Sequence, residues 1–369
     1  MIKVVWAIDP DTSQRFHCVF DTFSCLPIEP IQRFLNHCRK RGLADNTIST
    51  YAYRLVDFWR WLEQQALNWT EVDLENFGDF IHWYLMGGNV EVIAENIRQT
   101  MSARSARTVN QTVSAIQEFY AHHAIEGRVD EKRFTKLVRS MGKRGGFLKG
   151  IVKSTPEKRK QIKIKEPKRF PGCLSDEEVA TLANACTTYR DRLLIMLLRE
   201  TGVRRGEVLG LHLEDVRDLD VRGRIRIVRR DDNPNQAIAK GMEREIPILH
   251  NLKAVQETFN AYLLEEYPCE AEKLGHGMLF VSLSGKHVGA AMSLVRLNKL
   301  FDQLHSRTGM QAHPHLMRHT FATRMIQNNY LDQYVQQLLG HTSIATTKDI
   351  YSHVLDEMTL DEYIRGEEE

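Results

Sequence analysis

Hydrophobic and polar residues follow two different patterns along the N-terminal third of the chain. Residues 1–27 contain the short apolar runs VVWAI and FHCVF, which the polar segment 9–11 separates. Short apolar runs broken by a turn sequence predict one or two strands or an extended arm. Further on, apolar residues recur every three to four positions, as at Ile31, Phe34 and Cys38, and this spacing predicts a helix.

The helical pattern continues to about residue 130 and predicts a helical domain. Asp45 or Asn46 is expected to cap a helix that runs through TISTYAYRLVDFWRWLEQQ. Two more helical segments are expected around residues 71–86 and 105–124. Their aromatic residues lie at helical spacing, which is more typical of a core than of a platform for base stacking.

A second domain begins near residue 171 with a clear helix start. Ser175 and Glu178 have the spacing of a capping box, in which each side chain bonds the backbone N–H of the other residue. The apolar run RLLIMLLRE, which ends at Glu200, predicts a buried helix.

Two alternating segments in the second domain predict a small antiparallel sheet. They are residues 224–230 (RIRIVRR) and 243–249 (EREIPIL), with a turn-forming cluster at 231–235. The remainder, residues 251–364, is expected to be mostly helical. The expected fold is therefore mainly α with a small antiparallel β-sheet (α+β).

The segment between the two domains is strongly basic. From Lys132 to Arg169 the charged residues are lysines and arginines, except Glu157 and Glu166, and several glycines mark a flexible join. Because the whole chain has a net charge of only +2, this local excess favours contact with a polyanion such as DNA. A solvated linker is the alternative. The acidic C-terminus, taken alone, is more typical of a solubilising tail.

Cysteine usage argues against a cysteine metal site, and the lengths of the apolar runs argue against a membrane-spanning or secreted protein. The six cysteines form no CxxC pair, and no metal-ligand spacing surrounds them. They are typical of isolated thiols in a reducing cytosol. No apolar run approaches the length that spans a membrane, and the N-terminus is too polar for a secretory signal.

An arginine follows the predicted buried helix in the string TGVRRGEVLGL. Gly202 permits a tight turn there, and Arg204 would present a planar guanidinium suited to two phosphate oxygens. Glu207, one helical turn further on, can hold that guanidinium. Taken alone, the string is explained more simply by an ordinary Arg–Glu helical pair.

A second string, HLMRHTFAT, contains His315, Arg318 and His319. His315 and Arg318 share a helical face, where they pair an acid–base group with a phosphate-binding group. His319 is expected to point elsewhere, toward packing or a hydrogen bond. A zinc pair of His315 and His319, with His313 nearby, is the rival interpretation, but Leu316 stands where an HExxH motif requires glutamate.

The third string, LLGHTSIATTKDIY, places Tyr351 ten residues after His341. A tyrosine packed in a core would explain Tyr351 alone. Together, arginines that neutralise a phosphate, histidines that transfer protons and a tyrosine that attacks are suited to a phosphodiester. The order and spacing of the three strings support this interpretation more than any one string does.

These three strings, in this order, resemble the tyrosine recombinases, also called the phage integrase family, over roughly residues 171–360. The family pattern is a TGxR-type arginine, then HxxRH, then LGH followed by the nucleophilic tyrosine. The family also carries a lysine in the turn of a β-hairpin, and AIAKGMEREIPI places Lys240 there, after a long connection from Arg230. This segment and the basic connector are most similar to transposon-encoded members of the Tn554 transposase A type.

The resemblance implies a division of the chain into four parts. These are an N-terminal arm or extension (1–27), a helical SAM-like core-binding domain that contacts DNA (28–130), a basic interdomain linker (131–170), and a catalytic domain with a C-terminal subunit-contact segment (171–369).

The resemblance also implies a mechanism. Tyr351 attacks the scissile phosphate, forms a 3′-phosphotyrosyl bond and frees a 5′-hydroxyl, and strands are exchanged through a Holliday junction. The implied roles are stabilisation of the phosphate charge by Arg204 and Arg318, protonation of the leaving oxygen by Lys240, acid–base catalysis by His315, a hydrogen bond from His341 to the phosphate, and support from Glu207 and His319. No cofactor and no metal is implied, because the covalent intermediate conserves the bond energy.

The implied partner is double-stranded DNA at recombination or attachment sites. A homo-tetramer is expected on DNA, and a monomer or weak oligomer when the protein is free. Accessory recombinases or directionality proteins are further expected partners, whereas a membrane is not. The expected location is the bacterial cytoplasm, with nucleoid association when DNA is bound.

Other functions stay open at this point. A type IB topoisomerase would use the same tyrosine chemistry but rejoin the same strand. A catalytically silent DNA-binding regulator is a second alternative, although every catalytic position holds a competent residue. A metal-dependent nuclease built on His313, His315 and His319 would be inhibited by EDTA. Tyr363 is a poor alternative nucleophile because its spacing from His341 does not fit.

Overall fold

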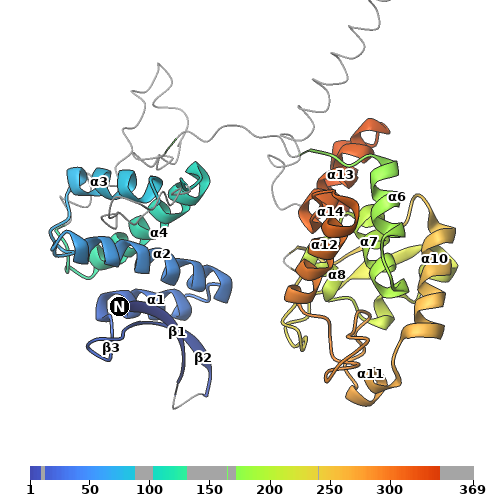
Figure 1. Cartoon of the computed structure of the whole chain (residues 1–369), viewed down its shortest axis with the longest axis horizontal. Coiled ribbons are helices and arrows are strands. Elements are labelled where there is room, and N and C mark those ends of the chain that lie inside the picture. Colours follow the sequence, from blue (N-terminus) through green and yellow to red (C-terminus); the bar gives the residue numbers. More distant parts are fainter. Residues whose placement is uncertain (10–12, 88–102, 131–163, 165–171, 240, 341–369) are drawn as a thin grey trace, which may run out of the picture. The chain divides into compact units, whose positions relative to one another are not determined.

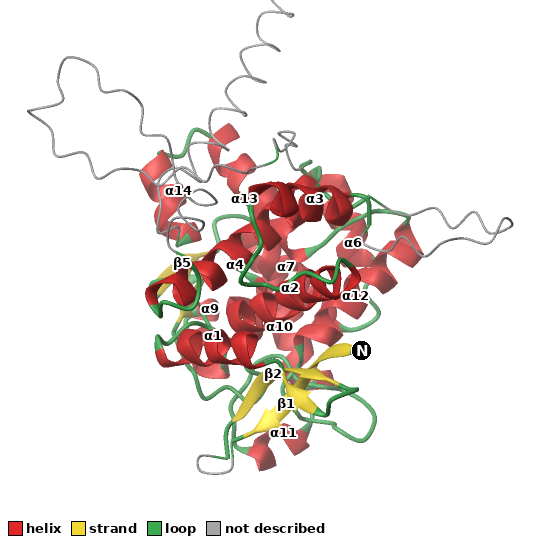
Figure 2. Ribbon diagram, turned by 90° about the vertical axis from the view of Figure 1, so that its left-hand side faces the viewer, coloured by secondary structure: helices red, strands yellow, loops and turns green. Residues whose placement is uncertain are grey.

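The computed structural model describes residues 1–9, 13–87, 103–130, 164, 172–239 and 241–340 of the chain (Figure 1). The chain divides into two compact units, Met1–Lys168 and Arg169–Glu369. Helices dominate the described part of both units, and a small antiparallel sheet occurs in each (Figure 2). The predicted α+β fold class is therefore confirmed. The basic segment 131–170 lies outside the described residues except for Ile164, and the four-part division stays a prediction.

The described helices of the N-terminal unit share one aromatic-rich core. Phe34 packs edge-on against Phe119 with ring centroids 5.8 Å apart, and Phe58 packs edge-on against Phe80 at 5.0 Å. These rings are buried, so the prediction that the aromatic residues form a core is confirmed. The helices are α1 (Glu29–Lys40), α2 (Asp45–Gln64), α3 (Leu74–Leu85) and α4 (Ala106–Ile125).

The start of α2 differs from the prediction. Neither Asp45 nor Asn46 caps this helix, because its N-cap is Ala44 and no side chain accepts a capping hydrogen bond. Asp45 instead lies in the first turn, where its negative charge is favourable beside the helix N-terminus. Asp73 and Ser105 do cap α3 and α4 with their side chains.

A three-stranded antiparallel sheet precedes these helices in the sequence. β1 (Ile2–Ile8) pairs with β2 (Arg15–Asp21), which pairs with β3 (Leu26–Pro27). Ile2 and Val19 are buried in the same core as the helices. The prediction of strands in this region is confirmed, and the strands form part of the core of the N-terminal unit.

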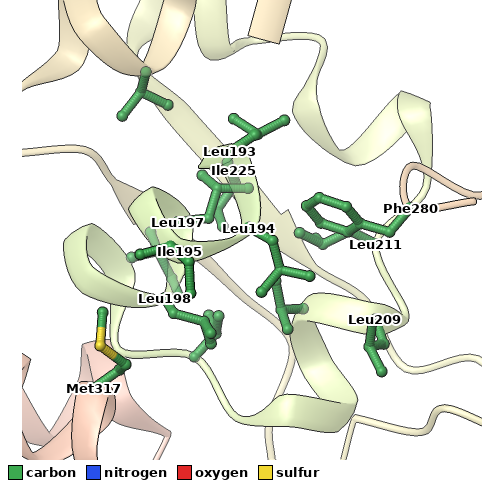
Figure 3. Packing of buried hydrophobic residues seen from close by; sticks show 14 of the residues in the cluster. Leu193, Leu194, Ile195, Leu197, Leu198, Leu209, Leu211, Ile225, Phe280 and Met317 are labelled. Carbon is green, nitrogen blue, oxygen red and sulfur yellow. The ribbon is translucent and has the colours of Figure 1, made fainter. Parts of the chain in front are cut away.

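The C-terminal unit packs around α7 (Tyr189–Thr201), the helix expected to be buried. Leu193 and Leu197 of α7 are fully buried and pack with Ile225 (Figure 3). The predicted capping box precedes α6, with Glu178 N donating to Ser175 Oγ at 3.2 Å and Ser175 N donating to Glu178 Oε2 at 2.8 Å. The other helical elements are α6 (Asp176–Asn184), α8 (Arg205–Leu209), a 3-10 turn (Leu213–Val216), α9 (Leu219–Arg222), α10 (Leu252–Ala261), a π-turn (Tyr262–Glu266), α11 (Cys269–Leu274), α12 (Leu294–Thr308), α13 (Pro314–Gln327) and α14 (Asp332–Leu339).

A two-stranded sheet lies between α9 and α10 in the sequence. β4 (Arg224–Ile227) pairs antiparallel with β5 (Arg244–Pro247), so the hairpin is confirmed, although both strands are shorter than predicted. The helical remainder is interrupted at residues 275–293, where the chain forms turns and isolated β-bridges. Within the described residues, none of the helices combines the length and apolar character needed to cross a lipid bilayer.

Candidate active site

The turn between α7 and α8 sets the position of Arg204. Gly202 ends α7 in the left-handed conformation, with a φ of +58°. A Cβ atom at Gly202 would lie 2.4 Å from Cδ1 of Phe321, so glycine alone fits both the backbone and the space. The chain then enters α8 with Arg204 as its N-cap. The tight turn predicted at Gly202 is confirmed.

Glu207 is a buried carboxylate that holds two arginines. Its Oε1 accepts a hydrogen bond from Arg204 Nη1 at 3.0 Å, and its Oε2 accepts one from Arg244 Nη2 at 2.9 Å. Burial alone raises the pKa of Glu207, but the hydrogen bonds and charges of Arg244 and Arg204 outweigh burial and hold this pKa below its usual value. Glu207 is therefore ionised at neutral pH, and the predicted pairing with Arg204 is confirmed.

Arg318 of α13 is buried beside the same group. Its Nη1 donates to Gly202 O and its Nη2 donates to Leu339 O, each at 2.7 Å, and only 5% of the residue is exposed. Burial, and then the charge of Arg204, lower the pKa of Arg318 to about 9, while Glu207 acts in the opposite direction. Arg318 stays charged at neutral pH, so the site concentrates positive charge.

Three arginines converge on the C-terminal end of α14. Leu339 O accepts from Arg318 Nη2 and also from Arg204 Nη1, the latter at 3.2 Å, while Gly340 O accepts from Arg204 Nη2 at 3.0 Å. Arg244 Nε donates to the carbonyl one residue before Leu339, at 2.7 Å. Carbonyl groups at a helix C-terminus lack partners within the helix and carry partial negative charge, which attracts cations. Leu339 O accepts hydrogen bonds from all three guanidinium groups, because Arg244 Nη2 also donates to it, at 3.4 Å.

Arg244 is the candidate that sequence reasoning missed. It begins β5, and its side chain is only 6% exposed. In an alternating strand with one solvent-facing side, an arginine is expected to face solvent, and the partner Glu207 is 37 residues away in sequence. The pairing of β5 with β4 brings the two together, and no spacing rule anticipates it. The sequence feature that could have indicated a second arginine partner was Glu207, because a buried carboxylate with two oxygens can hold two guanidinium groups.

Lys240 lies outside the described residues, but the next residue in the chain reaches the site. A Cβ atom on Gly241 would lie 3.2 Å from Arg204 Nη1 and 3.3 Å from both Glu207 Oε1 and Gly340 O. The connection between β4 and β5 therefore passes directly beside Arg204. The position and role of Lys240 stay a prediction.

The histidines of the second string gather at the start of α13. His313 is the N-cap, and its Nδ1 accepts from Leu316 N at 3.1 Å. The rings of His315 and His319 lie 4.7 Å apart at 80°, so His319 packs against His315. Burial first, and then the charges of His315, Arg318 and His313, lower the pKa of His319 to about 4. His319 is therefore neutral at physiological pH.

The histidines at the start of α13 differ from Arg318 in exposure and, among the described residues, do not form a metal site. His315 and Arg318 were expected to share a face, yet His315 is exposed whereas Arg318 is buried, so solvent reaches them very differently. In the part of the chain that the structure describes, His313, His315 and His319 do not bring three ligand atoms together as a metal ion requires. The nuclease alternative therefore gains no geometric support there.

His341 and Tyr351 also lie outside the described residues. His341 follows Gly340 directly in the sequence, and Arg204 donates a hydrogen bond to Gly340 O. Its role and that of Tyr351 stay predictions. The described residues thus supply the guanidinium groups of Arg204 and Arg318, the buried carboxylate of Glu207, the supporting arginine Arg244 and a histidine pair.

Two family models match the chain. The model described as the phage integrase family matches residues 173–358, and the model described as the phage integrase N-terminal SAM-like domain matches residues 31–127. The "Transposase A from transposon Tn554" of Staphylococcus aureus is 30% identical over 336 residues, which are 91% of this chain and 90% of the relative. The "Tyrosine recombinase XerC" of Listeria welshimeri is 26% identical over 343 residues, 90% of this chain and 96% of the relative.

Solved structures show a similar fold. The XerH site-specific recombinase bound to a palindromic difH substrate, in a post-cleavage complex, has a TM-score of 0.59 at 21% identity, covering 94% of this chain and 86% of that one. A lambda integrase dimer bound to a COC′ core site has a TM-score of 0.57 at 15% identity, covering 88% of this chain and 94% of that one. At such low identities the likeness concerns the fold.

Proposed function

The chain belongs to the phage integrase family, and from this membership we propose that it is a site-specific DNA recombinase, the integrase or transposase of a mobile element. It cleaves and rejoins DNA strands through a 3′-phosphotyrosyl intermediate and a Holliday junction. The likeness to the Tn554 transposase over nine tenths of the chain supports the link to a mobile element.

One structural observation supports this proposal most strongly. Arg204 and Arg318 both donate to the same atom, Leu339 O, at 3.2 Å and 2.7 Å. Their guanidinium groups are therefore separated by a distance that one small acceptor can bridge. A phosphate offers two non-bridging oxygens with full negative charge, which bind guanidinium groups more strongly than a neutral carbonyl does.

In the proposed cleavage step, the oxygen of Tyr351 attacks the scissile phosphorus and displaces the 5′-oxygen of the next nucleotide. The tyrosine proton passes to a neighbouring base, for which His315 is the candidate, and Lys240 protonates the leaving oxygen. Arg204 and Arg318 stabilise the added charge on the non-bridging oxygens, and His341 donates a hydrogen bond to one of them.

The rejoining step reverses this chemistry. The 5′-hydroxyl of another strand attacks the phosphotyrosyl bond and releases Tyr351, so the number of phosphodiester bonds is conserved. The reaction as proposed needs neither a cofactor nor a metal ion, because the covalent intermediate retains the energy of the broken bond.

Glu207 and Arg244 act as positioning residues in this proposal. Glu207 fixes the guanidinium of Arg204 and is itself fixed by Arg244, which also donates to the end of α14. Arg244 thereby links Glu207, the partner of Arg204, to the C-terminal end of α14, which precedes His341 in the sequence. A bidentate arginine that is already held in place loses less entropy when phosphate binds.

The proposed partner is double-stranded DNA at recombination sites. The structures of XerH bound to its difH substrate and of lambda integrase bound to a core site support this choice. We assign DNA contacts to residues 28–130 and 171–369, and to the basic linker 131–170. A homo-tetramer forms on DNA from a monomer or weak oligomer, and accessory recombinases or directionality proteins act with it. We place the protein in the bacterial cytoplasm, on the nucleoid when DNA is bound.

The test of this proposal traps the covalent intermediate. A nicked suicide substrate that loses its short 5′-fragment after cleavage prevents rejoining, so the protein stays attached to the DNA. The adduct is expected with the unmodified protein and with Tyr363→Phe, and is expected to be absent with Tyr351→Phe. The reverse pattern, loss of the adduct with Tyr363→Phe alone, would refute the assignment of Tyr351.

A two-site plasmid separates recombination from strand relaxation. The proposal predicts recombinant products that depend on two matched sites. Relaxed topoisomers without recombinants would support the topoisomerase alternative, and binding with no covalent adduct would support the silent regulator.

A further inference from the structure

A second group of titratable side chains lies in the N-terminal unit, at the C-terminal end of α4. His122, His123 and Glu126 each offer one ligand atom, and these atoms lie within 4.8 Å of one another. His122 Nε2 is 3.6 Å from Glu126 Oε1, and His123 Nδ1 is 3.6 Å from Glu126 Oε2. Both separations are too long for hydrogen bonds.

Both histidine nitrogens that face Glu126 are buried and unsatisfied. Neither His122 Nε2 nor His123 Nδ1 has a hydrogen-bond partner among the described residues. The side chain of His123 is 0% exposed and that of His122 is 8% exposed. Buried polar atoms in folded proteins nearly always have a partner, so two adjacent unsatisfied nitrogens indicate a missing ligand.

The other ring nitrogen of His123 decides which tautomer is present. Nε2 of His123 lies 3.0 Å from Pro30 O, and a carbonyl oxygen only accepts, so Nε2 carries the hydrogen. Nδ1 is then left with a lone pair that faces the carboxylate of Glu126. A histidine that donates one N–H to a carbonyl and turns its other nitrogen to a metal ion is a recurrent arrangement.

We propose that His122, His123 and Glu126 bind one divalent transition-metal ion, with zinc as the best match. Two imidazole nitrogens and one carboxylate oxygen are ligands that zinc takes. Tetrahedral zinc with bonds of about 2.1 Å places its ligand atoms about 3.4 Å apart. His122 Nε2 lies 3.6 Å from Glu126 Oε1 and His123 Nδ1 lies 3.6 Å from Glu126 Oε2, so a small rotation of the carboxylate brings one oxygen to the ion. Because His122 and Glu126 also line an open surface hollow, water completes the coordination.

Two arginines lie close enough to weaken this binding. Arg33 Nη1 is 3.5 Å from Glu126 Oε1, and both Arg33 and Arg128 are bonded to Glu29, at 3.0 Å and 2.8 Å. The side chain of Arg33 is 51% exposed, so it can turn away from Glu126 while it keeps its ion pair with Glu29. Exposed ion pairs contribute little, so the ion displaces a weak contact.

The ion would fasten the last turn of α4 to α1. Nε2 of His123 donates a hydrogen bond to Pro30 O of α1, and the ring of His122 stacks on the ring of His37 of α1 with centroids 4.4 Å apart. A metal ion that holds both histidines therefore stabilises the contact between the two helices. The arginine site belongs to the other unit of the chain.

Zinc binding to the full-length chain tests the proposal. The protein is stripped of metal with a chelator, and zinc is titrated calorimetrically into the unmodified protein, Glu126→Gln, His122→Gln and the control His82→Gln. His82 is an exposed histidine on α3, so its loss leaves the site intact. We expect the unmodified protein and His82→Gln to bind one more zinc ion per chain than the two site variants, and to gain more thermal stability from zinc.

The two site variants guard against a folding artefact. The side chain of Glu126 is 28% exposed, so glutamine replaces it with little strain, and circular dichroism checks the helix content of each variant. Equal zinc stoichiometry and an equal rise in Tm across all four proteins would refute the site, as would an unmodified protein that binds no zinc.

Discussion

Two groups of buried polar side chains, one in each unit, differ in whether their atoms have partners. In the C-terminal unit, each charge at the site is partnered: Glu207 holds two guanidinium groups, and Arg318 donates to two carbonyls. In the N-terminal unit, His122 and His123 each turn an unsatisfied nitrogen toward Glu126. The described polar atoms of the first group are held by hydrogen bonds, whereas two nitrogens of the second group have none among the described residues.

This difference shows what each group can do. A complete network fixes the position of its side chains before substrate arrives, which is what charge stabilisation in a transition state requires. An incomplete network of neutral ligands has affinity for a cation instead.

The largest effect is expected from removal of Arg318. Arg318→Ala should lower the rate of DNA cleavage about 10³-fold, because a fixed charge that stabilises the phosphate is lost. Arg318→Lys should recover only part of this rate, because an ammonium group lacks the fork that spans two oxygens. Single-turnover cleavage assays give both rates. Arg296→Ala, an exposed arginine on α12, is the control and should change the rate less than tenfold.

The next effect concerns stability. Glu207→Gln leaves Arg244 buried without its ionic partner and should reduce the free energy of unfolding by about 4 kcal/mol. Glu245→Gln is the matched control, since Glu245 pairs with Arg224 at 3.3 Å and both side chains are half exposed. That control should cost less than about 1 kcal/mol. Urea denaturation compares them, and equal losses would mean that the buried network adds no stability.

A smaller loss is expected at Gly202, whose carbonyl accepts from Arg318. Gly202→Ala should cost about 3 kcal/mol, because the new methyl group meets Phe321 and the backbone stays left-handed. Gly309→Ala has a φ of +72° and open space around it, so it should cost only about 1 kcal/mol. The difference between their urea midpoints isolates the steric part. If both variants lose the same stability, Phe321 does not press on the turn.

The smallest effect is a pH dependence that the two units share. The pKa of His319 is lowered to about 4 from 6.5, so between these values the unfolded chain binds the proton that the folded chain does not. Stability therefore falls as pH drops from 6.5 toward 4, and burial of His122 and His123 acts in the same direction. NMR titration of His319 should show a midpoint near pH 4, and His315→Gln should raise it slightly. A midpoint near 6.5 in the unmodified protein would contradict its burial.

The spacing of apolar residues predicted the helices, because this spacing depends only on which side of a single segment is buried. The spacing of Ile31 and Phe34, the capping box at Ser175 and the alternation at 224–230 all concern neighbours in the sequence. The cap of α2 was predicted wrongly. Asp45 has a side chain suited to capping, but it is the first residue of the helix and Ala44 occupies the N-cap position. Local composition cannot distinguish the first turn of a helix from the position before it.

Contacts between distant segments were beyond sequence reasoning. The motifs identified Arg204, Glu207 and Arg318 as a set, and the structure brings all three together. Arg244 was missed because its burial depends on the strand pair and on the end of α14, neither of which its own neighbours in the sequence reveal. The unsatisfied nitrogens of His122 and His123 were missed for a related reason, since only the fold shows whether a polar atom finds a partner.

We propose that Arg318 acts on the charge of the phosphate and does not merely support the fold. Replacement of one non-bridging oxygen of the scissile phosphate by a methyl group removes the negative charge that the guanidinium would neutralise. Cleavage of this neutral substrate, measured with unmodified protein and with Arg318→Ala, separates the two roles. We expect Arg318→Ala to slow cleavage of the normal substrate about 10³-fold but cleavage of the neutral substrate less than about tenfold. A penalty of the same size on both substrates would contradict the claim and assign Arg318 a purely structural role.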